Sequence, residues 1–537
     1  MVGRSLRTVS NALPLCLMNK DTILNTDTPI ESPGPQAGGL GRQAAQGAVW
    51  NYLAFVVSKG LVFVSTLILA QILLPAEFGL VGMALLVITV LDILRDFGIG
   101  SAVIYYGREG PAAANMAFAL SSGIGIVLFV ANWLLAPFTA QFFYTDNPQD
   151  IPLVTSLIQV LGFSLLFASL GSTHDALLQK EINYRRRMVP EVGRTMLKGI
   201  LSVALAFAGL GVWSLVWGQV LGEACATVLL WSVAKWRPAR VFRRDLFRSM
   251  LGYSFQAMLS GGLGTLLADV DYFIIGALLG PAALGIYTLA FRLPELVIMN
   301  MARAVATVAF AVAAKLQSDL AAMREAYLRM QRYMLIILAP LGFGLFAVTP
   351  ALVHTLFKSE WAAVIPVMQI LSIYMVLGGI NYWPGVIYKA VGRPGILNSI
   401  SLVKLAMLVP ALWWGAVSYG IEGVAWGQLV VRIVGIAIDM VVVARFVKIS
   451  VWDNLRVIWP PLTSAALMSA AVRLLYFALD PAERGGIAVL ALSVAVGGAV
   501  YVAAIWLLDR AAVSDMIDLA RSMLKRNRLA ASSSPGG

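Results

Sequence analysis

The stretch LILAQILLPAEFGLVGMA, residues 67–84, returns as FIIGALLGPAALGIYTLA at residues 273–290, with six of 18 positions identical and no gap. A second pair, GVWSLVWGQV at residues 211–220 and GIEGVAWGQL at residues 420–429, shares its first Gly and a Trp-Gly-Gln. The offsets of 206 and 209 residues nearly agree, which indicates a duplication. Each copy contains an even number of apolar stretches, so we expect two parallel lobes related by an axis along a membrane normal.

The chain is far more apolar than a soluble protein. Of its 537 residues 59% are hydrophobic and 13% are charged, whereas a soluble domain has about 45–50% and about 25%. This composition excludes a soluble globular protein. Because a membrane-spanning helix needs about 20 apolar residues, the pattern predicts an all-α polytopic membrane protein with about 14 transmembrane helices.

The distribution of Lys and Arg gives an independent test of this topology. Among the 40 basic residues, 29 lie in connections on one predicted side, two lie on the other, and nine lie within spans. Basic residues collect in cytoplasmic loops. We therefore predict an even number of spans with both termini in the cytoplasm.

These patterns divide the chain into six units. They are a disordered cytoplasmic tail (1–46), an N-lobe of helices 1–6 (47–235), a basic cytoplasmic linker (236–249), a C-lobe of helices 7–12 (250–447), helices 13 and 14 (457–508), and a cytoplasmic tail with an amphipathic helix (509–537). Two Cys and two His are too few for a disulfide framework or a histidine metal centre. We expect no metal, no cofactor and no nucleic-acid partner.

Nine basic residues lie within the predicted spans. They are Lys59, Arg95, Arg194, Lys198, Arg292, Arg303, Lys404, Arg432 and Arg473. Each costs roughly 2.5–3.5 kcal/mol at the centre of a helix that faces lipid. We therefore expect them to line a wet interior, and at about 100° per residue Glu191, Arg194 and Lys198 share one helix face.

Residues at mid-depth matter most for a binding site. Lys59, Arg292, Lys404 and Arg432 lie near the middle of their spans, and all four are basic. A competing interpretation makes the buried charges structural ion pairs, with partners at helical spacing: Asp92 for Arg95, Glu295 for Arg292 and Asp439 for Arg432. Lys59 and Lys404 have no acid at such spacing, which favours a cationic cavity.

The acidic residues suggest a second role. Asp269 and Asp271 lie near the outer end of the seventh span, and Asp96 lies within the second, in one stripe with Asp92 and Arg95. Ion coupling or gating by Asp96, Asp269, Asp271 or Glu295 is left open. Glu223 and Arg432 both lie four residues after the Gln of a Trp-Gly-Gln, and an ion pair between them would join the lobes.

The N-terminal part resembles a known family. Its core LAQILLPAEFGLVGMA (69–84), the DFGIGSA at residues 96–102, and DYFIIGALLGPAALGIYTLAFRLPEL (271–296) resemble the polysaccharide transporters of the multidrug/oligosaccharidyl-lipid/polysaccharide superfamily. These are the Wzx-type flippases for O-antigen and exopolysaccharide repeat units. The similarity covers residues 41–508.

The resemblance implies a lipid-linked oligosaccharide flippase of the bacterial inner membrane, not an enzyme. Its substrate would be an undecaprenyl-pyrophosphate-linked repeat unit, turned to the outer leaflet by alternating access of two lobes. Polysaccharide polymerase machinery would be a partner. The positions that match the family's cationic cavity are Lys59, Arg95, Arg292, Lys404 and Arg432. Helices 13 and 14 would form a groove for the lipid tail.

Two other functions compete with this one. A cation-coupled drug or metabolite antiporter of the same superfamily should show uncompensated acids at mid-depth, where this chain has bases. A membrane polysaccharide polymerase or ligase typically needs a large external loop, and the predicted outer connections are short.

Overall fold

The structure is a computed structural model. It describes residues 57–96, 98–106, 109–143, 148–181, 184–239, 242–299, 301, 319–380, 384, 394–447, 449–479 and 486–516. Every regular element in these ranges is helical, which confirms the predicted all-α class. The predicted N-terminal tail, most of the C-terminal amphipathic helix and Arg303 lie outside the described residues.

The main helices are long and apolar, and several begin with a proline, which is favoured in the first turn because its missing N–H would be unpaired there anyway. Their bounds are Val57–Ile72, α2 (Pro75–Asp96), α3 (Ile99–Tyr105), α4 (Pro111–Phe143), α5 (Ile151–Lys180), α6 (Tyr184–Phe207), α7 (Val212–Val233), α8 (Arg244–Ala268), α9 (Val270–Pro294), α11 (Leu320–Leu356), α12 (Val364–Ile380), α14 (Pro394–Val447), α15 (Val451–Leu479) and α16 (Ile487–Leu508). Short π or 3-10 turns lie at Pro148–Asp150, Glu295–Met299 and Ser359–Trp361. Within the described ranges nine helices are long and apolar enough to cross a membrane, so this is a multi-pass membrane protein.

Two of these helices contain a reversal at a glycine. Gly420 divides the 54-residue α14 with φ 62° and ψ −143°, and residues around Gly415 pack against those around Gly423. Gly280 divides α9 in the same manner, with φ 79°. The positive φ angles suit glycine because it has no Cβ. Each reversal therefore divides one helical segment into two arms.

The backbone supports the duplication inferred from sequence. Gly211, which precedes α7, has φ 52° and ψ −127°, close to the values at Gly420. These are the first glycines of the two matched Trp-Gly-Gln segments. The two copies therefore share a turn geometry as well as residues.

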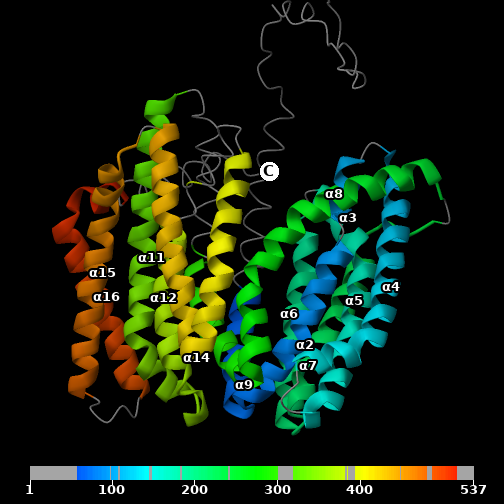
Figure 1. Cartoon of the computed structure of the whole chain (residues 1–537), viewed down its shortest axis with the longest axis horizontal. Helices are drawn as coiled ribbons and strands as arrows, with labels where there is room; N and C mark the ends of the chain where they lie inside the picture. The colour runs from blue at the N-terminus through cyan, green and yellow to red at the C-terminus, as the bar shows by residue number, and fades with distance from the viewer. Residues whose placement is uncertain are drawn as a thin grey trace, which may run out of the picture.

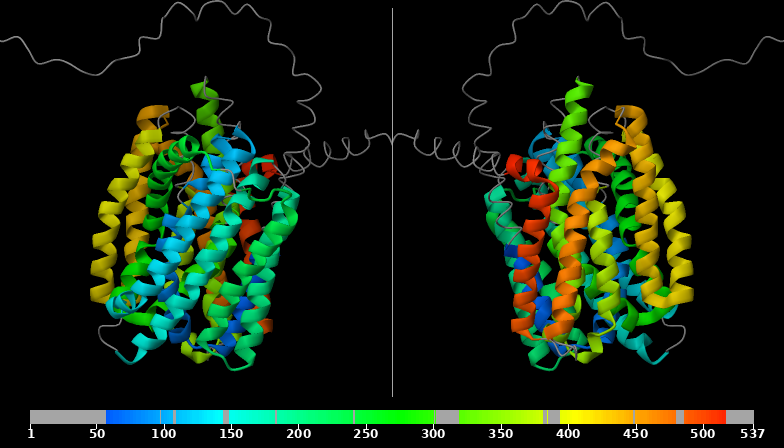
Figure 2. Two further views of the ribbon diagram at one scale, coloured as in Figure 1. Left: turned by 90° about the vertical axis from the view of Figure 1, so that its right-hand side faces the viewer. Right: turned by 90° about the vertical axis from the view of Figure 1, so that its left-hand side faces the viewer.

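The helices form two groups that converge at one end (Figure 1). The N-terminal group contains α2–α7, and α8 leans on its α2, α3 and α4. The C-terminal group contains α9, α11, α12 and α14–α16, with α15 and α16 side by side on its outer face (Figure 2). Helix α8 begins at Arg244, inside the segment predicted as a linker.

The groups meet where α2 lies against α9. A Cβ on Gly79 would lie 1.6 Å from the carbonyl oxygen of Pro281, and a Cβ on Gly285 would lie 1.9 Å from that of Pro75. These two contacts are equivalent in the repeat, since both prolines and both glycines are separated by 206 residues. We name these four residues the α2–α9 seam. Backbone this close leaves no room for a side chain.

Two further contacts close the same end of the molecule. The Phe78 ring meets the buried Trp361 ring edge-on, with centroids 5.3 Å apart. The Gln71 amide donates to the carbonyl oxygen of Leu356. We call this the closed end. At the opposite end, named the basic end, the α7–α8 connection carries Lys235, Arg237 and Arg243, and the two groups stand apart (Figure 1).

Candidate functional site

The structure gives Lys404 an acid partner that the sequence prediction lacks. Its Nζ lies 2.6 Å from Oδ2 of Asp439, whose side chain is 5% exposed. The two residues lie on opposite arms of the α14 hairpin. The expectation of an unpaired Lys404 considered only its own helix, and it is wrong because the reversal at Gly420 brings the second arm alongside.

Arg432 makes a different contact from the predicted ones. Its guanidinium carbon lies 4.2 Å from the centroid of the Tyr374 ring, a cation–π geometry. Asp439 is taken by Lys404, and Glu223 pairs with Arg194 in its own group at 3.4 Å. The predicted Glu223–Arg432 pair is therefore wrong in this conformation. Arg432 lies close enough to Asp439 for their charges to interact, but Lys404 is the residue that forms the ion pair with Asp439. Arg95 does pair with Asp92, at 2.7 Å.

Helices α6 and α7 hold two polar contacts one turn apart. The Lys198 ammonium donates to Oε1 of Gln219 at 2.5 Å. Arg194, four residues before Lys198 on α6, pairs with Glu223, four residues after Gln219 on α7. A Cβ on Gly222 would lie 2.9 Å from the Cβ of Lys198, so the two backbones pack closely. This packing fixes the base of the Lys198 side chain.

Arg292 of the C-terminal group lies close enough to Lys198 of the N-terminal group for their charges to interact. Arg292 also interacts with Tyr272 and Glu295. Like charges repel, so an unliganded pair of this kind is unfavourable and an anion between them would relieve it. We name Lys198 and Arg292 the inter-lobe cation pair. It joins residues from both copies of the repeat.

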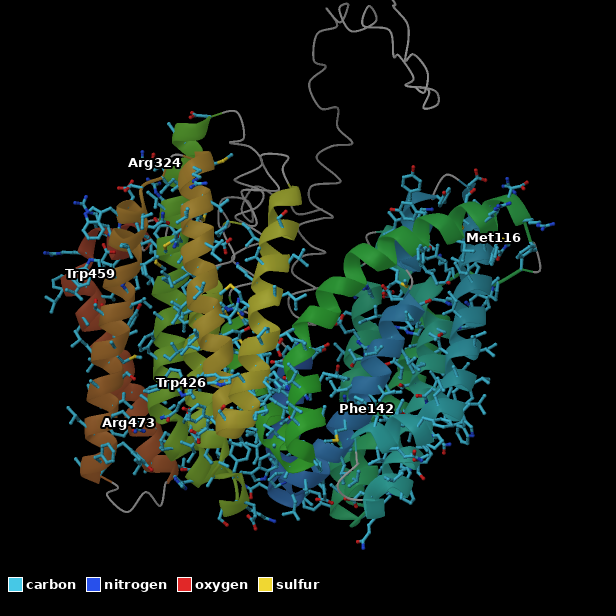
Figure 3. The ribbon with its side chains drawn as sticks, in the orientation of Figure 1. Met116, Phe142, Arg324, Trp426, Trp459 and Arg473 are labelled. Carbon is cyan, nitrogen blue, oxygen red and sulfur yellow. The ribbon has the colours of Figure 1, made fainter. Side chains whose placement is uncertain are left out.

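Two other predicted cations lie elsewhere. Lys59 is half-buried on the helix Val57–Ile72, which packs on α6 where Ser65 meets Gly199. Arg473 lies on α15, with its guanidinium carbon 5.4 Å from the Phe477 ring centroid, in the helix group away from α2–α7 (Figure 3).

The predicted acids separate into buried and open ones. Asp271 is 1% exposed and accepts hydrogen bonds from Tyr287 Oη at 2.7 Å and Gln428 Nε2 at 2.9 Å. Asp269 is half-buried within range of the Glu295 charge, and Asp96 is exposed at the end of α2. Among these, Asp271 is the enclosed carboxylate.

A cavity of about 480 Å³ lies inside the N-terminal group, in the half nearer the basic end. Its walls come from α2, α3, α5, α6 and α7, and Arg95 and Asp96 both line it. Asp175 and Arg187 close one side with two hydrogen bonds, at 2.7 and 2.9 Å. The cavity reaches Arg194 and Glu223. The structure thus brings charged groups from four helices, α2, α5, α6 and α7, around one space.

Residues 68–366 match the family described as polysaccharide biosynthesis protein. The chain belongs to this family. The match spans the seam, the cavity and the inter-lobe cation pair, so these three features lie within the part of the chain that the family defines.

Relatives of this chain cover most of its length. The teichuronic acid biosynthesis protein TuaB of Bacillus subtilis is 25% identical over 82% of this chain and 89% of its own. The lipopolysaccharide biosynthesis protein WzxC of Escherichia coli is 25% identical over 76% and 82%. The succinoglycan biosynthesis transport protein ExoT of Rhizobium meliloti is 25% identical over 89% and 95%.

Solved structures share the fold. The lipid II flippase MurJ in an inward closed conformation gives a TM-score of 0.70 with 14% identity, over 87% of this chain and all of that one. An inward-facing multidrug resistance transporter of the MATE family, itself of the MOP superfamily, gives a TM-score of 0.58 with 16% identity, over 74% of this chain and 99% of that one. These likenesses confirm the fold class.

The sequence predicts part of this site. It selects Arg292 but assigns Lys198 only to a helix face. Their proximity depends on how α6 and α9 are placed, which helical spacing does not encode. The repeated Trp-Gly-Gln was an available signal, because Gln219 and Gln428 both bind charged side chains.

Proposed function

We propose that this protein is a flippase that moves an undecaprenyl-pyrophosphate-linked polysaccharide repeat unit from the cytoplasmic to the outer leaflet by alternating access. One observation carries the proposal: each helix group contributes one cation to the inter-lobe pair, between groups joined at one end and apart at the other. The names of TuaB, WzxC and ExoT support it, since all three concern polysaccharide biosynthesis.

The chemistry of the substrate matches the cation pair. A pyrophosphate away from water is strongly unfavourable unless cations and hydrogen-bond donors replace its hydration. Lys198 and Arg292 come from different groups, so an anion between them would couple its binding to their relative position. Translocation breaks no covalent bond, and the proposal includes no catalytic residue.

Orientation follows from the charge distribution. Because basic connections favour the cytoplasm, the charge distribution supports an orientation in a bacterial inner membrane with the basic end and both termini in the cytoplasm and the closed end outside. A negative interior favours outward movement of an anion by about 2.3 kcal/mol per charge per 100 mV.

A second function is favoured by one observation. Asp271 is a buried carboxylate whose side-chain partners, Tyr287 and Gln428, are neutral, and such a group is suited to carry a proton or a cation. A cation-coupled antiporter of small molecules would depend on Asp271 and not on the inter-lobe cation pair. Substitution of each residue separates the two functions.

Deletion of the gene in the host bacterium tests the proposal. We expect lipid-linked oligosaccharide to accumulate on the cytoplasmic leaflet and surface polysaccharide to be lost. Wild-type protein and the control Arg473→Ala should restore export, and Arg292→Ala should not. Unchanged surface polysaccharide together with unchanged lipid-linked pools would contradict the proposed function.

A further inference from the structure

The cavity in the N-terminal group has the dimensions of a ligand site and a different chemistry from the inter-lobe cation pair. Its volume of about 480 Å³ lies within the roughly 300–1,000 Å³ of small-molecule pockets. The lining includes three arginines, Arg95, Arg187 and Arg194, and four carboxylates, Asp96, Asp175, Glu191 and Glu223. The carboxylates outnumber the arginines, so the cavity does not favour a second anion.

The arginines of the cavity are already neutralised. Arg187 makes two hydrogen bonds to Asp175, Arg194 pairs with Glu223, and Arg95 pairs with Asp92 just outside the lining. Within the described ranges no ion pair is found for Asp96 or Glu191. Carboxylates with spare oxygens accept hydrogen bonds from hydroxyl groups, and guanidinium groups donate to ring and hydroxyl oxygens.

Such a lining suits a ligand that is rich in hydroxyl groups and carries no negative charge. A sugar ring offers donors to Asp96 and Glu191 and acceptors to Arg187 or Arg194. A pyrophosphate offers only acceptors and would be repelled by the carboxylates. The cavity therefore discriminates by chemistry between the two parts of a lipid-linked oligosaccharide.

The cavity and the cation pair are neighbours. Arg194 and Glu223 line the cavity, and Lys198 and Gln219 lie four residues away on the same two helices. Four residues of helix rise correspond to about 6 Å. A pyrophosphate held by Lys198 would leave its first sugars within reach of the cavity, on the side of the basic end.

We propose that this cavity binds the saccharide of the substrate, taking one or two uncharged, hydroxyl-rich sugar residues next to the pyrophosphate. This inference rests on the proposed flippase function and adds a second subsite to it. Asp96 and Glu191 bind the hydroxyl groups, whereas Lys198 and Arg292 bind the pyrophosphate. Recognition of the sugar is thus separate from recognition of the lipid carrier.

Binding by the full-length protein in lipid nanodiscs tests this division. The probes are undecaprenyl pyrophosphate and the lipid-linked repeat unit extracted from the deletion strain. We expect the sugar-bearing probe to bind about tenfold more tightly, as a few charged hydrogen bonds imply. Glu191→Gln and Asp96→Asn should remove that advantage and leave binding of the sugar-free probe unchanged. Lys198→Gln should weaken both probes by the same factor.

The control is Glu360→Gln, the same change at an exposed position of the closed end, which should alter neither affinity. Equal affinities of the two probes for wild-type protein would overturn the saccharide site and leave the flippase proposal intact. Weaker binding of both probes by Glu191→Gln would also overturn it. Failure of wild-type protein to bind either probe would overturn the proposed function, and this inference with it.

Discussion

The two Trp-Gly-Gln segments occupy equivalent places in the repeat, and their glutamines bind side chains of opposite charge. In the N-terminal copy, Gln219 accepts a hydrogen bond from the Lys198 ammonium. In the C-terminal copy, Gln428 donates one to the carboxylate of Asp271. An amide can do both because it carries a carbonyl and an NH₂ group. The duplicated scaffold is retained, and the ion that it positions is exchanged.

The environments of the two bound side chains, Lys198 and Asp271, also differ. Lys198 is half-buried and close to Arg292 of the other helix group. Asp271 is 1% exposed and also bound by Tyr287 of its own helix. One copy thus presents its charge to the other group, and the second encloses its charge. We infer that the first copy is suited to bind a substrate anion and the second to hold a fixed or proton-carrying carboxylate.

The largest effect should follow from reversing the N-terminal charge. Lys198→Glu would place a carboxylate beside Arg292, where the two would neutralise each other and no longer attract an anion. We expect export to fall by about a hundredfold, the equivalent of losing two charged hydrogen bonds. Surface polysaccharide in the complemented deletion strain measures it. Lys198→Arg should retain most export, and equal export by Lys198→Glu would mean that the charge has no role.

The two repeat-related contacts of the α2–α9 seam should be equally sensitive to an added methyl group. Gly79→Ala and Gly285→Ala each place a methyl group within 2 Å of a carbonyl oxygen in the other group. Overpacking of this kind costs about 1–3 kcal/mol, and we expect the closed end to open. Thiol labelling of a cysteine introduced at Trp361 should accelerate in both variants.

Gly252→Ala is the matched control for the seam, because nothing lies within 4 Å of the Cβ that it would add. Unaltered labelling in Gly79→Ala would show that the seam tolerates a side chain and does not hold the groups together.

The glutamines themselves should differ in their effect on stability. Gln428→Leu leaves one oxygen of the buried Asp271 with fewer donors, at a cost of about 1–3 kcal/mol. Gln219→Leu costs less, because the half-buried Lys198 has access to other partners. Thermal unfolding of the purified variants in detergent compares them. A larger loss of thermal stability from Gln219→Leu than from Gln428→Leu would contradict the conclusion that Asp271 is the enclosed charge and Lys198 the accessible one.

The smallest effect concerns Arg432, which lies four residues after Gln428. Tyr374→Leu removes the ring beneath Arg432, and a cation–π contact contributes about 0.5–1 kcal/mol when exposed and about 2 when desolvated. We expect a small loss of thermal stability with export retained. Phe477→Leu, which removes the ring beside Arg473 on the outer helix α15, is the matched comparison and should lose less.

The sequence predicts the scaffold well because the scaffold depends on local patterns. Span length, the distribution of basic residues and the repeat require no knowledge of how helices pack. The repeat even contains the seam, since Pro75, Gly79, Pro281 and Gly285 are among its identical positions. The positions that are identical in the two copies therefore include residues that contact each other across the two groups.

The binding residues are harder to predict because their partners lie on other helices. Spacing along one helix suggested Asp439 as a partner for Arg432, whereas the α14 hairpin gives Asp439 to Lys404. Helical spacing also identified neither Gln219 nor Arg292 as a neighbour of Lys198. Charges within a membrane protein are paired by helix packing, and periodicity alone does not contain that information.

Transport by the purified protein tests the central claim most directly. The measurement is the rate at which a fluorescently labelled, undecaprenyl-pyrophosphate-linked oligosaccharide crosses the bilayer of proteoliposomes, detected by quenching from outside. We predict rapid crossing with wild-type protein and with Arg473→Ala, and crossing at the protein-free rate with the double variant Lys198→Ala, Arg292→Ala. Wild-type crossing at the protein-free rate, or full activity of the double variant, would contradict the claim that the inter-lobe cation pair moves a lipid-linked pyrophosphate.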